Sequence, residues 1–345
     1  MLHRRNLLRH GAGLAAGLAF ARPALAWPGP VTLRLHHFLP AVSNIHRNVL
    51  VPWSRQIEQA SGGNLRIRIF PSMQLGGAPQ QLYDQARDGV ADIVWTLPGY
   101  TAGRFPRIEV MELPFIANKG GVENASACHD FAASSLGDEF SEVQPLVFWA
   151  HDGGLIHTRK PVSNLEDLRG LKLRFPTRQS GEALRALGAA PIGMPLPQVP
   201  EALSQGVLDG AVVPWEVVPT VKLHELLHSH TAVPGRPTLY TSTNILAMNK
   251  NRYSQLPAEL RQVLDTHSGT PLAEKIGMSL DDQATQNAEL VRRRGNTVSE
   301  ISADEAARWR QATAPVAEAW LSRMKHDGGE ALLAAARASF ARHAA

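Results

Sequence analysis

The chain has 345 residues, 44% hydrophobic and 19% charged, which is the composition of a globular protein without low-complexity segments. Its 35 Lys and Arg residues exceed its 31 Asp and Glu residues, but four of the basic residues lie within residues 1–26, which contain no acid. The remainder therefore carries no net charge with histidine neutral, and this excludes binding to nucleic acid or to an anionic membrane as the basis of function. A chain of this length is expected to form two domains.

The N-terminus has the three parts of an export signal. A basic segment is followed by a short apolar run from Gly11 to Phe20 and by the small residues Ala24–Ala26, which predict cleavage before Trp27. The apolar run is about half of what a membrane span needs. The pair Arg4-Arg5 favours a twin-arginine signal, with a Sec signal as the alternative. We therefore predict that residues 1–26 are a signal peptide and that the protein is exported to the periplasm.

Cys128 is the single cysteine, which excludes an intrachain disulfide. It lies in a predicted amphipathic helix, where we expect it to be buried rather than to act as a nucleophile. The chain has no G-x-S-x-G, P-loop or G-x-G-x-x-G motif.

The first third of the exported chain alternates strands with helices. Apolar residues recur with period two in the predicted strands and with helical spacing in the predicted helices. The predicted elements are a strand at 31–38, a helix at 46–63, a strand at 64–71, a helix at 78–90 and a strand at 91–98. This order predicts a parallel sheet covered by helices.

The same alternation returns further along the chain. A strand is predicted within 145–158, a helix at 164–170, a strand at 171–176, helices at 179–188 and 197–210, and a strand at 211–215. Asn164 is the expected N-cap of the short helix. The chain then becomes mostly helical.

The helical part has three predicted segments before a final Ala-rich helix. They span residues 256–269, 270–293 and 301–328. Ser302 and Glu305 are spaced as a capping box at the start of the third segment.

Two segments about 120 residues apart resemble each other. "ARDGVADIVW" ends at Trp95 and "LSQGVLDGAVVPW" ends at Trp215, and each reads as helix, glycine turn, short strand and tryptophan. Ligands bind at the carboxyl ends of strands in α/β sheets, so this pattern favours two lobes facing a cleft. The alternative is two unrelated buried tryptophans.

Arg174 lies at the carboxyl end of a predicted strand. Lys172 and Arg174 share one face of that strand, opposite Leu171, Leu173 and Phe175. A guanidinium at this place can hold a carboxylate through two parallel hydrogen bonds. The alternative is a structural ion pair with Asp or Glu.

The stretch "HELLHSH" contains the H-E-x-x-H pattern of zinc peptidases at His224, Glu225 and His228. A helix would place both histidines on one face with Glu225 as general base. A third ligand is missing at the expected spacing, since Thr231 and Pro234 occupy those positions. A zinc hydrolase is therefore kept only as the alternative function.

Taken together, these segments resemble the periplasmic solute-binding proteins of TRAP transporters, the DctP-like family. The resemblance covers nearly the whole exported chain. It is carried by "GGNLRIRIFPSMQLGG", "DGVADIVWTLPGYTAGRFPRIEVMELPF", "DLRGLKLR" and "ALSQGVLDG", in that order. It implies a two-lobed periplasmic binding protein fold of class α/β, each lobe a mostly parallel sheet with flanking helices. Residues 27–150 and 240–280 would form the first lobe and residues 151–239 and 281–345 the second, with a long bridging helix.

The resemblance also implies the kind of ligand. The carboxylate-binding arginine of the family corresponds to Arg174. Two positions depart from the family pattern: Val213 stands where asparagine is usual, and Leu155 lies near the place of a frequent second arginine. Both departures suit a less polar acid that packs on aromatic side chains.

We therefore expect a non-enzymatic protein, monomeric and without a cofactor, that captures a small organic acid and delivers it to a TRAP membrane permease. A periplasmic ligand sensor is a further alternative. A 2-oxo or hydroxy acid, an aromatic acid and another monocarboxylate all remain possible as the ligand. The expected ligand-binding residues are Arg174, Trp215, Trp95, Tyr100, Phe38, His37, Arg104 and Trp149.

Overall fold

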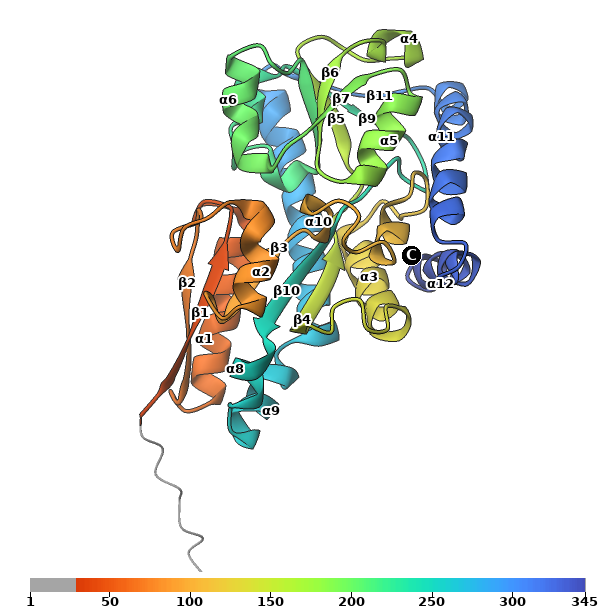
Figure 1. Cartoon of the computed structure of the whole chain (residues 1–345). Coiled ribbons are helices and arrows are strands. Elements are labelled where there is room, and N and C mark those ends of the chain that lie inside the picture. Colours follow the sequence, from red (N-terminus) through yellow and green to blue (C-terminus); the bar gives the residue numbers. More distant parts are fainter. Residues whose placement is uncertain (1–28, 345) are drawn as a thin grey trace, which may run out of the picture.

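The computed structural model of the chain describes residues 29–344, so the predicted signal peptide at residues 1–26 lies outside the described part. Within residues 29–344, no helix has both the length and the apolar character needed to cross a membrane. The described residues form two lobes, each built around its own sheet (Figure 1).

The first lobe contains a five-stranded sheet. In spatial order its strands are β2 (Leu65–Phe70), β1 (Val31–His37), β3 (Ile93–Thr96), β10 (Thr243–Asn249) and β4 (Val143–Ala150). β1 pairs in parallel with β2 and β3, as the alternation of strands and helices predicts. β10 comes from much later in the chain and pairs antiparallel with β3 and β4. The first lobe is therefore built from two separate stretches of sequence.

Short helices and turns surround this sheet. They are the π-helical η1 (Ile45–Leu50), α1 (Val51–Ala60), η2 (Pro79–Gln81), α2 (Leu82–Arg87), η3 (Pro98–Tyr100), η4 (Ile108–Glu112), α3 (Gly121–Ser135), α8 (Lys250–Ser254) and α9 (Ala258–Thr266). The predicted helix at 46–63 is thus π-helical before it becomes α-helical. The change falls beside Pro52, which has no N–H for the usual helical hydrogen bond.

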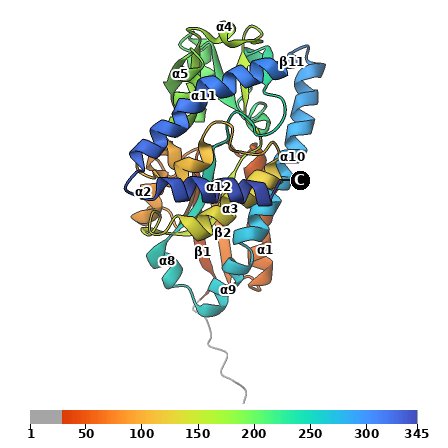
Figure 2. The ribbon, with the colours of Figure 1, turned by 90° about the vertical axis from the view of Figure 1, so that its right-hand side faces the viewer.

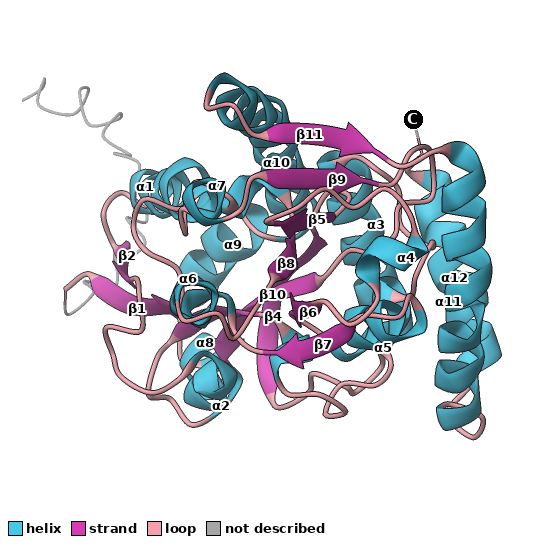
Figure 3. Cartoon of the chain, turned by 90° about the horizontal axis from the view of Figure 1, so that it is seen from above, coloured by secondary structure: helices cyan, strands magenta, loops and turns pink. Residues whose placement is uncertain are grey.

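The second lobe contains a six-stranded sheet, seen from above in Figure 3. Its spatial order is β11 (Thr297–Glu300), β9 (Ser229–Ala232), β5 (Leu155–Thr158), β8 (Gly210–Val213), β6 (Lys172–Phe175) and β7 (Ala190–Gly193). β6 runs parallel to β7 and β8, and β9 parallel to β11, while β5 is antiparallel to its neighbours. The sheet is thus mixed, with its parallel pairs on either side of β5.

The helices of the second lobe follow the predicted order. They are α4 (Leu165–Leu168), α5 (Arg178–Ala186), η5 (Leu196–Gln198), α6 (Val199–Ser204), η6 (Trp215–Val217), α7 (Leu223–Leu226) and α11 (Ala303–Arg323). Asn164 caps α4 by accepting from the Asp167 N–H at 3.0 Å, and Ser302 caps α11 by accepting from the Glu305 N–H at 3.1 Å. The Glu305 carboxylate does not complete the predicted capping box. It accepts instead from the Trp309 indole at 2.9 Å, because that buried N–H needs a partner.

The predicted long helix joins the two lobes. α10 (Gly269–Arg293) packs on α3 and β4 of the first lobe and on η6 and β11 of the second (Figure 1). α3 and α10 cross closely at Gly121, where an added Cβ would lie 2.7 Å from the Gly277 carbonyl oxygen. The chain also passes between the lobes at residues 151–154 and again at 233–242. Together with α10 and the passage at residues 324–328 between α11 (Ala303–Arg323) and α12 (Gly329–Arg342), these segments make four connections between the lobes within residues 29–344.

The final helix differs from the predicted domain boundaries. α12 (Gly329–Arg342) packs on α3 of the first lobe, whereas the sequence assigned residues 281–345 to the second (Figure 2). Ser339 Oγ donates to the Ala127 carbonyl at 2.9 Å, and Asn118 Nδ2 donates to the Phe340 carbonyl at 2.8 Å. α12 therefore buries its apolar face mainly on α3.

Candidate ligand-binding site

A cavity of about 480 Å³, including the part that opens to solvent, is lined by both lobes and by the crossing segments. The first lobe and the crossings contribute Phe38, Leu39, Trp95, Leu97, Tyr100, Trp149, His151, Tyr240, Ser242 and Asn244. The second lobe contributes Arg174, Pro176, Leu196, Val212, Val213, Pro214, Glu216 and Val217.

Arg174 lies at the end of β6 and is 2% exposed. Its Nε donates to the Met194 carbonyl at 2.9 Å and its Nη1 to the Val212 carbonyl at 3.2 Å, and it is also in hydrogen-bonding contact with the Tyr100 hydroxyl. No carboxylate among residues 29–344 forms an ion pair with it, so the predicted alternative of a structural ion pair does not apply. Burial lowers the pKa of Arg174, because a charge without a counterion is costly in a dry environment.

Aromatic side chains of the first lobe form one wall of the cavity. The ring centroids of Phe38 and Trp95 are 5.1 Å apart, those of Trp95 and Trp149 are 5.9 Å apart, and those of Phe38 and Tyr100 are 5.5 Å apart. The Trp95 indole donates to Asn244 Oδ1 at 2.9 Å, which fixes its ring against the sheet. These contacts create a preformed apolar surface that favours flat, aromatic groups.

Three polar groups that line the cavity are buried without a hydrogen-bond partner. They are the Tyr240 hydroxyl, the Ser242 hydroxyl and Oε2 of Glu216. Buried polar groups are normally paired, so unpaired groups around a cavity indicate where a bound molecule makes its polar contacts. The arrangement offers donors and acceptors as well as one unpaired positive charge.

Burial also determines the protonation of two other groups in the cavity. It lowers the pKa of His151 to about 4 and raises the pKa of Glu216 to about 8. Both groups are therefore uncharged near neutral pH. Arg174 supplies the charge that lines the cavity at that pH.

Five of the eight residues expected from the sequence line this cavity: Arg174, Trp95, Tyr100, Phe38 and Trp149. Val213, at the position where the family pattern has asparagine, also lines it and contributes only methyl groups. The remaining three expected residues lie elsewhere.

Trp215 follows β8 but does not line the cavity. Its ring packs against His157 and His230, with centroids 5.7 Å and 5.4 Å away, and it lines a separate pocket together with residues of the crossing segment 152–154. The repeated segments therefore place only Trp95 at the cavity. Pro214 turns the chain after β8, so that Pro214 and Glu216 line the cavity in place of the tryptophan.

His37 is buried behind the aromatic wall. Its Nε2 lies 2.9 Å from Nδ1 of His46, and its ring centroid lies 5.3 Å from that of Trp95. Burial lowers the pKa of His37 to about 3. It thus supports Trp95 from behind and does not line the cavity.

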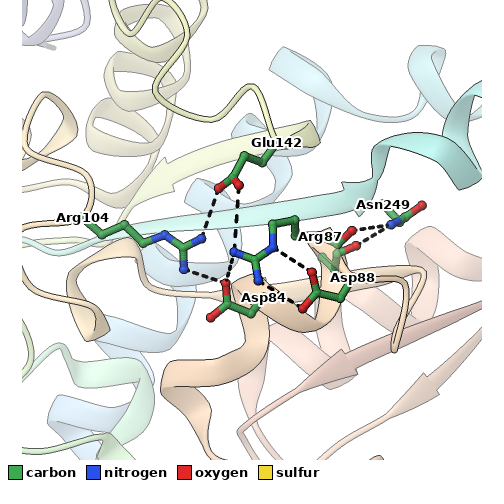
Figure 4. A network of polar contacts seen from close by, with 7 residues as sticks. Asp84, Arg87, Asp88, Arg104, Glu142 and Asn249 are labelled. Atoms are coloured by element: carbon green, nitrogen blue, oxygen red, sulfur yellow. Dashed lines mark hydrogen bonds and ion pairs between the residues drawn. The ribbon is translucent and has the colours of Figure 1, made fainter.

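Arg104 belongs to a surface network instead of the cavity (Figure 4). Its Nη1 lies 2.8 Å from Asp84 Oδ1 and its Nη2 lies 3.2 Å from Glu142 Oε2. Arg87 joins the same two carboxylates, and the Arg104 guanidinium lies over the Tyr83 ring. The acids attract Arg104 outward, where its charge stays partly hydrated.

The H-E-x-x-H pattern does not form the geometry of a zinc site. α7 ends at Leu226, so His224 and His228 do not share one helical face. Glu225 pairs with Arg294 at 3.8 Å, and His230 lies on strand β9. Among residues 29–344, no group of three potential metal ligands comes together.

The sequence did not single out His151, Glu216, Tyr240, Ser242 and Asn244, which also line the cavity. One signal for three of them was available. Tyr240, Ser242 and Asn244 alternate along an extended segment that leads into β10, so they share one face. His151 lies where the chain crosses between the lobes and Glu216 lies in η6 after β8, and no local pattern indicates that either side chain reaches the cavity.

Comparison with known proteins places these features in a family. Residues 35–323 match the family described as DctP, bacterial extracellular solute-binding protein, family 7. The C4-dicarboxylate-binding periplasmic protein DctP of Rhodobacter capsulatus is 26% identical over 351 residues, covering 99% of this chain and 100% of that protein.

Two solved structures are similar over most of their length. A TRAP solute-binding protein from Rhodoferax ferrireducens T118, in complex with copurified benzoate, is 44% identical with a TM-score of 0.87 and covers 91% of this chain and 98% of that chain. A marine metagenome TRAP solute-binding protein specific for aromatic acid ligands, in complex with 3-hydroxybenzoate, is 37% identical with a TM-score of 0.88, covering 91% and 99%.

Proposed function

The chain belongs to the DctP family of bacterial extracellular solute-binding proteins, and on that premise we propose that its cavity binds an aromatic monocarboxylate such as benzoate. The observation that carries the proposal is the unpaired charge of Arg174. A buried guanidinium that forms no ion pair with a carboxylate of residues 29–344, and that lines a cavity between the two lobes, needs an anion to compensate it. A ligand carboxylate supplies that anion.

The carboxylate-binding end of the cavity contains more than Arg174. Arg174 opposes the effect of burial on the pKa of both Tyr100 and Tyr240, so the two phenol groups lie beside the guanidinium. The Tyr240 hydroxyl has no partner and is available to donate to the same carboxylate. Ser242 offers a second hydroxyl in the cavity. One guanidinium and two hydroxyls suit a single carboxylate.

The rest of the cavity favours an aromatic ring. Phe38, Trp95 and Trp149 form the wall described above, and Val213 and Val217 add apolar surface from the second lobe. Each aromatic contact contributes about 0.5–1.5 kcal/mol beyond the burial of apolar area. Arg174 is the one cationic side chain lining the cavity, so a second carboxylate would remain unpaired, which disfavours C4-dicarboxylates.

The relatives support the same ligand class. The Rhodoferax ferrireducens protein binds benzoate and the marine metagenome protein binds 3-hydroxybenzoate, whereas the less similar Rhodobacter capsulatus protein binds C4-dicarboxylates. Arg174, five aromatic side chains and the absence of a second cation from the lining of this cavity agree with the first two.

The bound acid is then delivered to a TRAP membrane permease. Ligand contacts with both lobes stabilise the closed state, because a ligand favours a state only through contacts that it makes in that state. The chain acts as a monomer in the periplasm after removal of residues 1–26 by the twin-arginine or Sec route.

Isothermal titration of the exported protein with benzoate tests this proposal. Three comparison ligands each change one property. Cyclohexanecarboxylate lacks the aromatic ring, benzamide lacks the charge, and succinate is a dicarboxylate. We expect benzoate to bind most tightly and benzamide most weakly of the three six-membered ring compounds. Binding of succinate tighter than benzoate, or equal binding of benzamide and benzoate, would contradict the proposal.

A further inference from the structure

Glu216 is the one carboxyl group that lines the ligand cavity within the described residues. It lies in η6, directly after the turn that follows β8, and it is 7% exposed. Its Oε2 is buried without a hydrogen-bond partner, and no hydrogen bond or ion pair to its side chain is formed within residues 29–344. A buried carboxyl oxygen without a hydrogen-bond partner lowers the stability of the folded protein, and a purely structural role for Glu216 does not explain this cost.

The position of Glu216 relative to Arg174 is the second observation. Arg174 opposes the effect of burial on the pKa of Tyr100 and Tyr240, but burial is the one cause of the raised pKa of Glu216. No hydrogen bond or ion pair joins the Glu216 carboxyl group to Arg174 within residues 29–344. The two residues line the same cavity from different elements, Arg174 from β6 and Glu216 from η6, together with the aromatic side chains of the first lobe.

We infer that Glu216 recognises a hydroxyl group on the ring of the bound acid, so that the preferred ligand is a hydroxybenzoate over benzoate itself. This inference rests on the proposed function. A phenolic O–H donates to the unpaired Oε2, and the bond satisfies both partners. A ligand without the hydroxyl leaves the carboxyl group unpaired after water is expelled, which costs roughly five- to hundredfold in affinity.

The other ionisable groups near Glu216 do not supply that bond. His151, Tyr100, Tyr240 and Arg174 line the same cavity, and Arg47 lines an outer pocket that Glu216 also borders. Asp152 is a further buried carboxyl group, and the proximity of Glu216 helps to raise its pKa. None of them forms a hydrogen bond or ion pair with the Glu216 carboxyl group. A ligand hydroxyl is the remaining partner.

Isothermal titration with pairs of ligands tests the inference. 3- and 4-hydroxybenzoate are compared with 3- and 4-methylbenzoate, because each methyl group matches the hydroxyl in size but cannot donate. In the unmodified protein, we expect at least one hydroxybenzoate to bind five- to hundredfold more tightly than its methyl counterpart. Glu216→Leu should reverse this order, and Glu216→Gln, which keeps an acceptor oxygen, should preserve it. Glu259→Leu, on the exposed first turn of α9, is the matched control and should keep the order of the unmodified protein.

The outcomes separate the inference from the function on which it rests. If benzoate binds but each hydroxyl and methyl pair binds equally, or Glu216→Leu keeps the preference for hydroxyl, the role of Glu216 is wrong and the proposed function stands. If no aromatic acid binds the unmodified protein, the proposed function fails, and the inference fails with it.

Discussion

Replacing Arg174 with methionine separates the charge of the guanidinium from its packing. Methionine has a similar length and no charge, so it fills much of the same space. The substitution removes the hydrogen bonds to Met194 and Val212, each worth about 1.5–3 kcal/mol for a charged donor. It also removes a desolvated charge without a counterion, which costs several kcal/mol in the folded protein. These effects oppose each other, so we expect the free energy of unfolding without ligand to change by no more than about 2 kcal/mol.

The effect on ligand binding is not balanced in this way. Without the guanidinium, the ligand carboxylate is buried unpaired, which costs about 2–5 kcal/mol of binding free energy. This corresponds to a loss of benzoate affinity of about 30-fold to several thousandfold. Isothermal titration gives the dissociation constant, and thermal unfolding without ligand gives the stability.

Two results would refute this reasoning. One is an Arg174→Met protein that binds benzoate within threefold of the unmodified affinity, since the charge would then make no difference. The other is a loss of binding that Arg174→Lys shares in full, because lysine keeps the charge and should retain part of the affinity.

The remaining predictions concern residues in and around the cavity. Arg104→Ala should leave benzoate affinity within twofold and lower stability by about 1–2 kcal/mol in thermal unfolding, because the contacts of Arg104 are two partly exposed ion pairs and the Tyr83 ring. A large loss of affinity would show that Arg104 contributes to ligand binding. Gly154→Ala should weaken benzoate binding at least tenfold by titration, since the added Cβ would meet the Tyr240 ring and displace its hydroxyl; unchanged affinity would mean that Tyr240 does not contact the carboxylate. Benzoate affinity should fall as pH rises through about 8, because Glu216 then ionises beside a bound anion, and Glu216→Gln should remove this dependence. Because burial raises the pKa of Glu216 from 4.5 to about 8, its contribution to the free energy of unfolding is fully present below pH 4.5 and is lost as pH rises through about 8. The difference in thermal stability between the unmodified protein and Glu216→Gln should therefore change over this pH interval.

The elements were predictable because they depend on local patterns, and the class of ligand followed from the resemblance to a family. Period-two alternation located β1, β2 and β3, and side-chain caps located the starts of α4 and α11. Arg174 was predictable as well, since a cation at the carboxyl end of a strand is visible in the sequence. The resemblance of several motifs in order then indicated the family that the comparison confirmed.

Errors arose where a local pattern was assumed to fix a side-chain direction. Trp95 and Trp215 end similar segments, but Pro214 turns the second segment so that its tryptophan packs against histidines. Arg104 was expected at the cavity, yet the acids Asp84 and Glu142, 20 and 38 residues away in sequence, hold it at the surface. Contacts of this kind are set by the assembled lobe.

By itself, the sequence determined the α/β class, the two-lobed organisation, the long bridging helix and the place of Arg174 at the carboxyl end of a strand. Periodicity, capping residues and motif order are local properties, and each is readable without coordinates. Only the tertiary structure decided which side chains share the cavity. Arg174, Glu216 and Tyr240 come from three separate segments, and the packing of both lobes around α10 brings them together. It also left Oε2 of Glu216 buried without a hydrogen-bond partner among residues 29–344, because the hydrogen bonds of a side chain depend on every element around it.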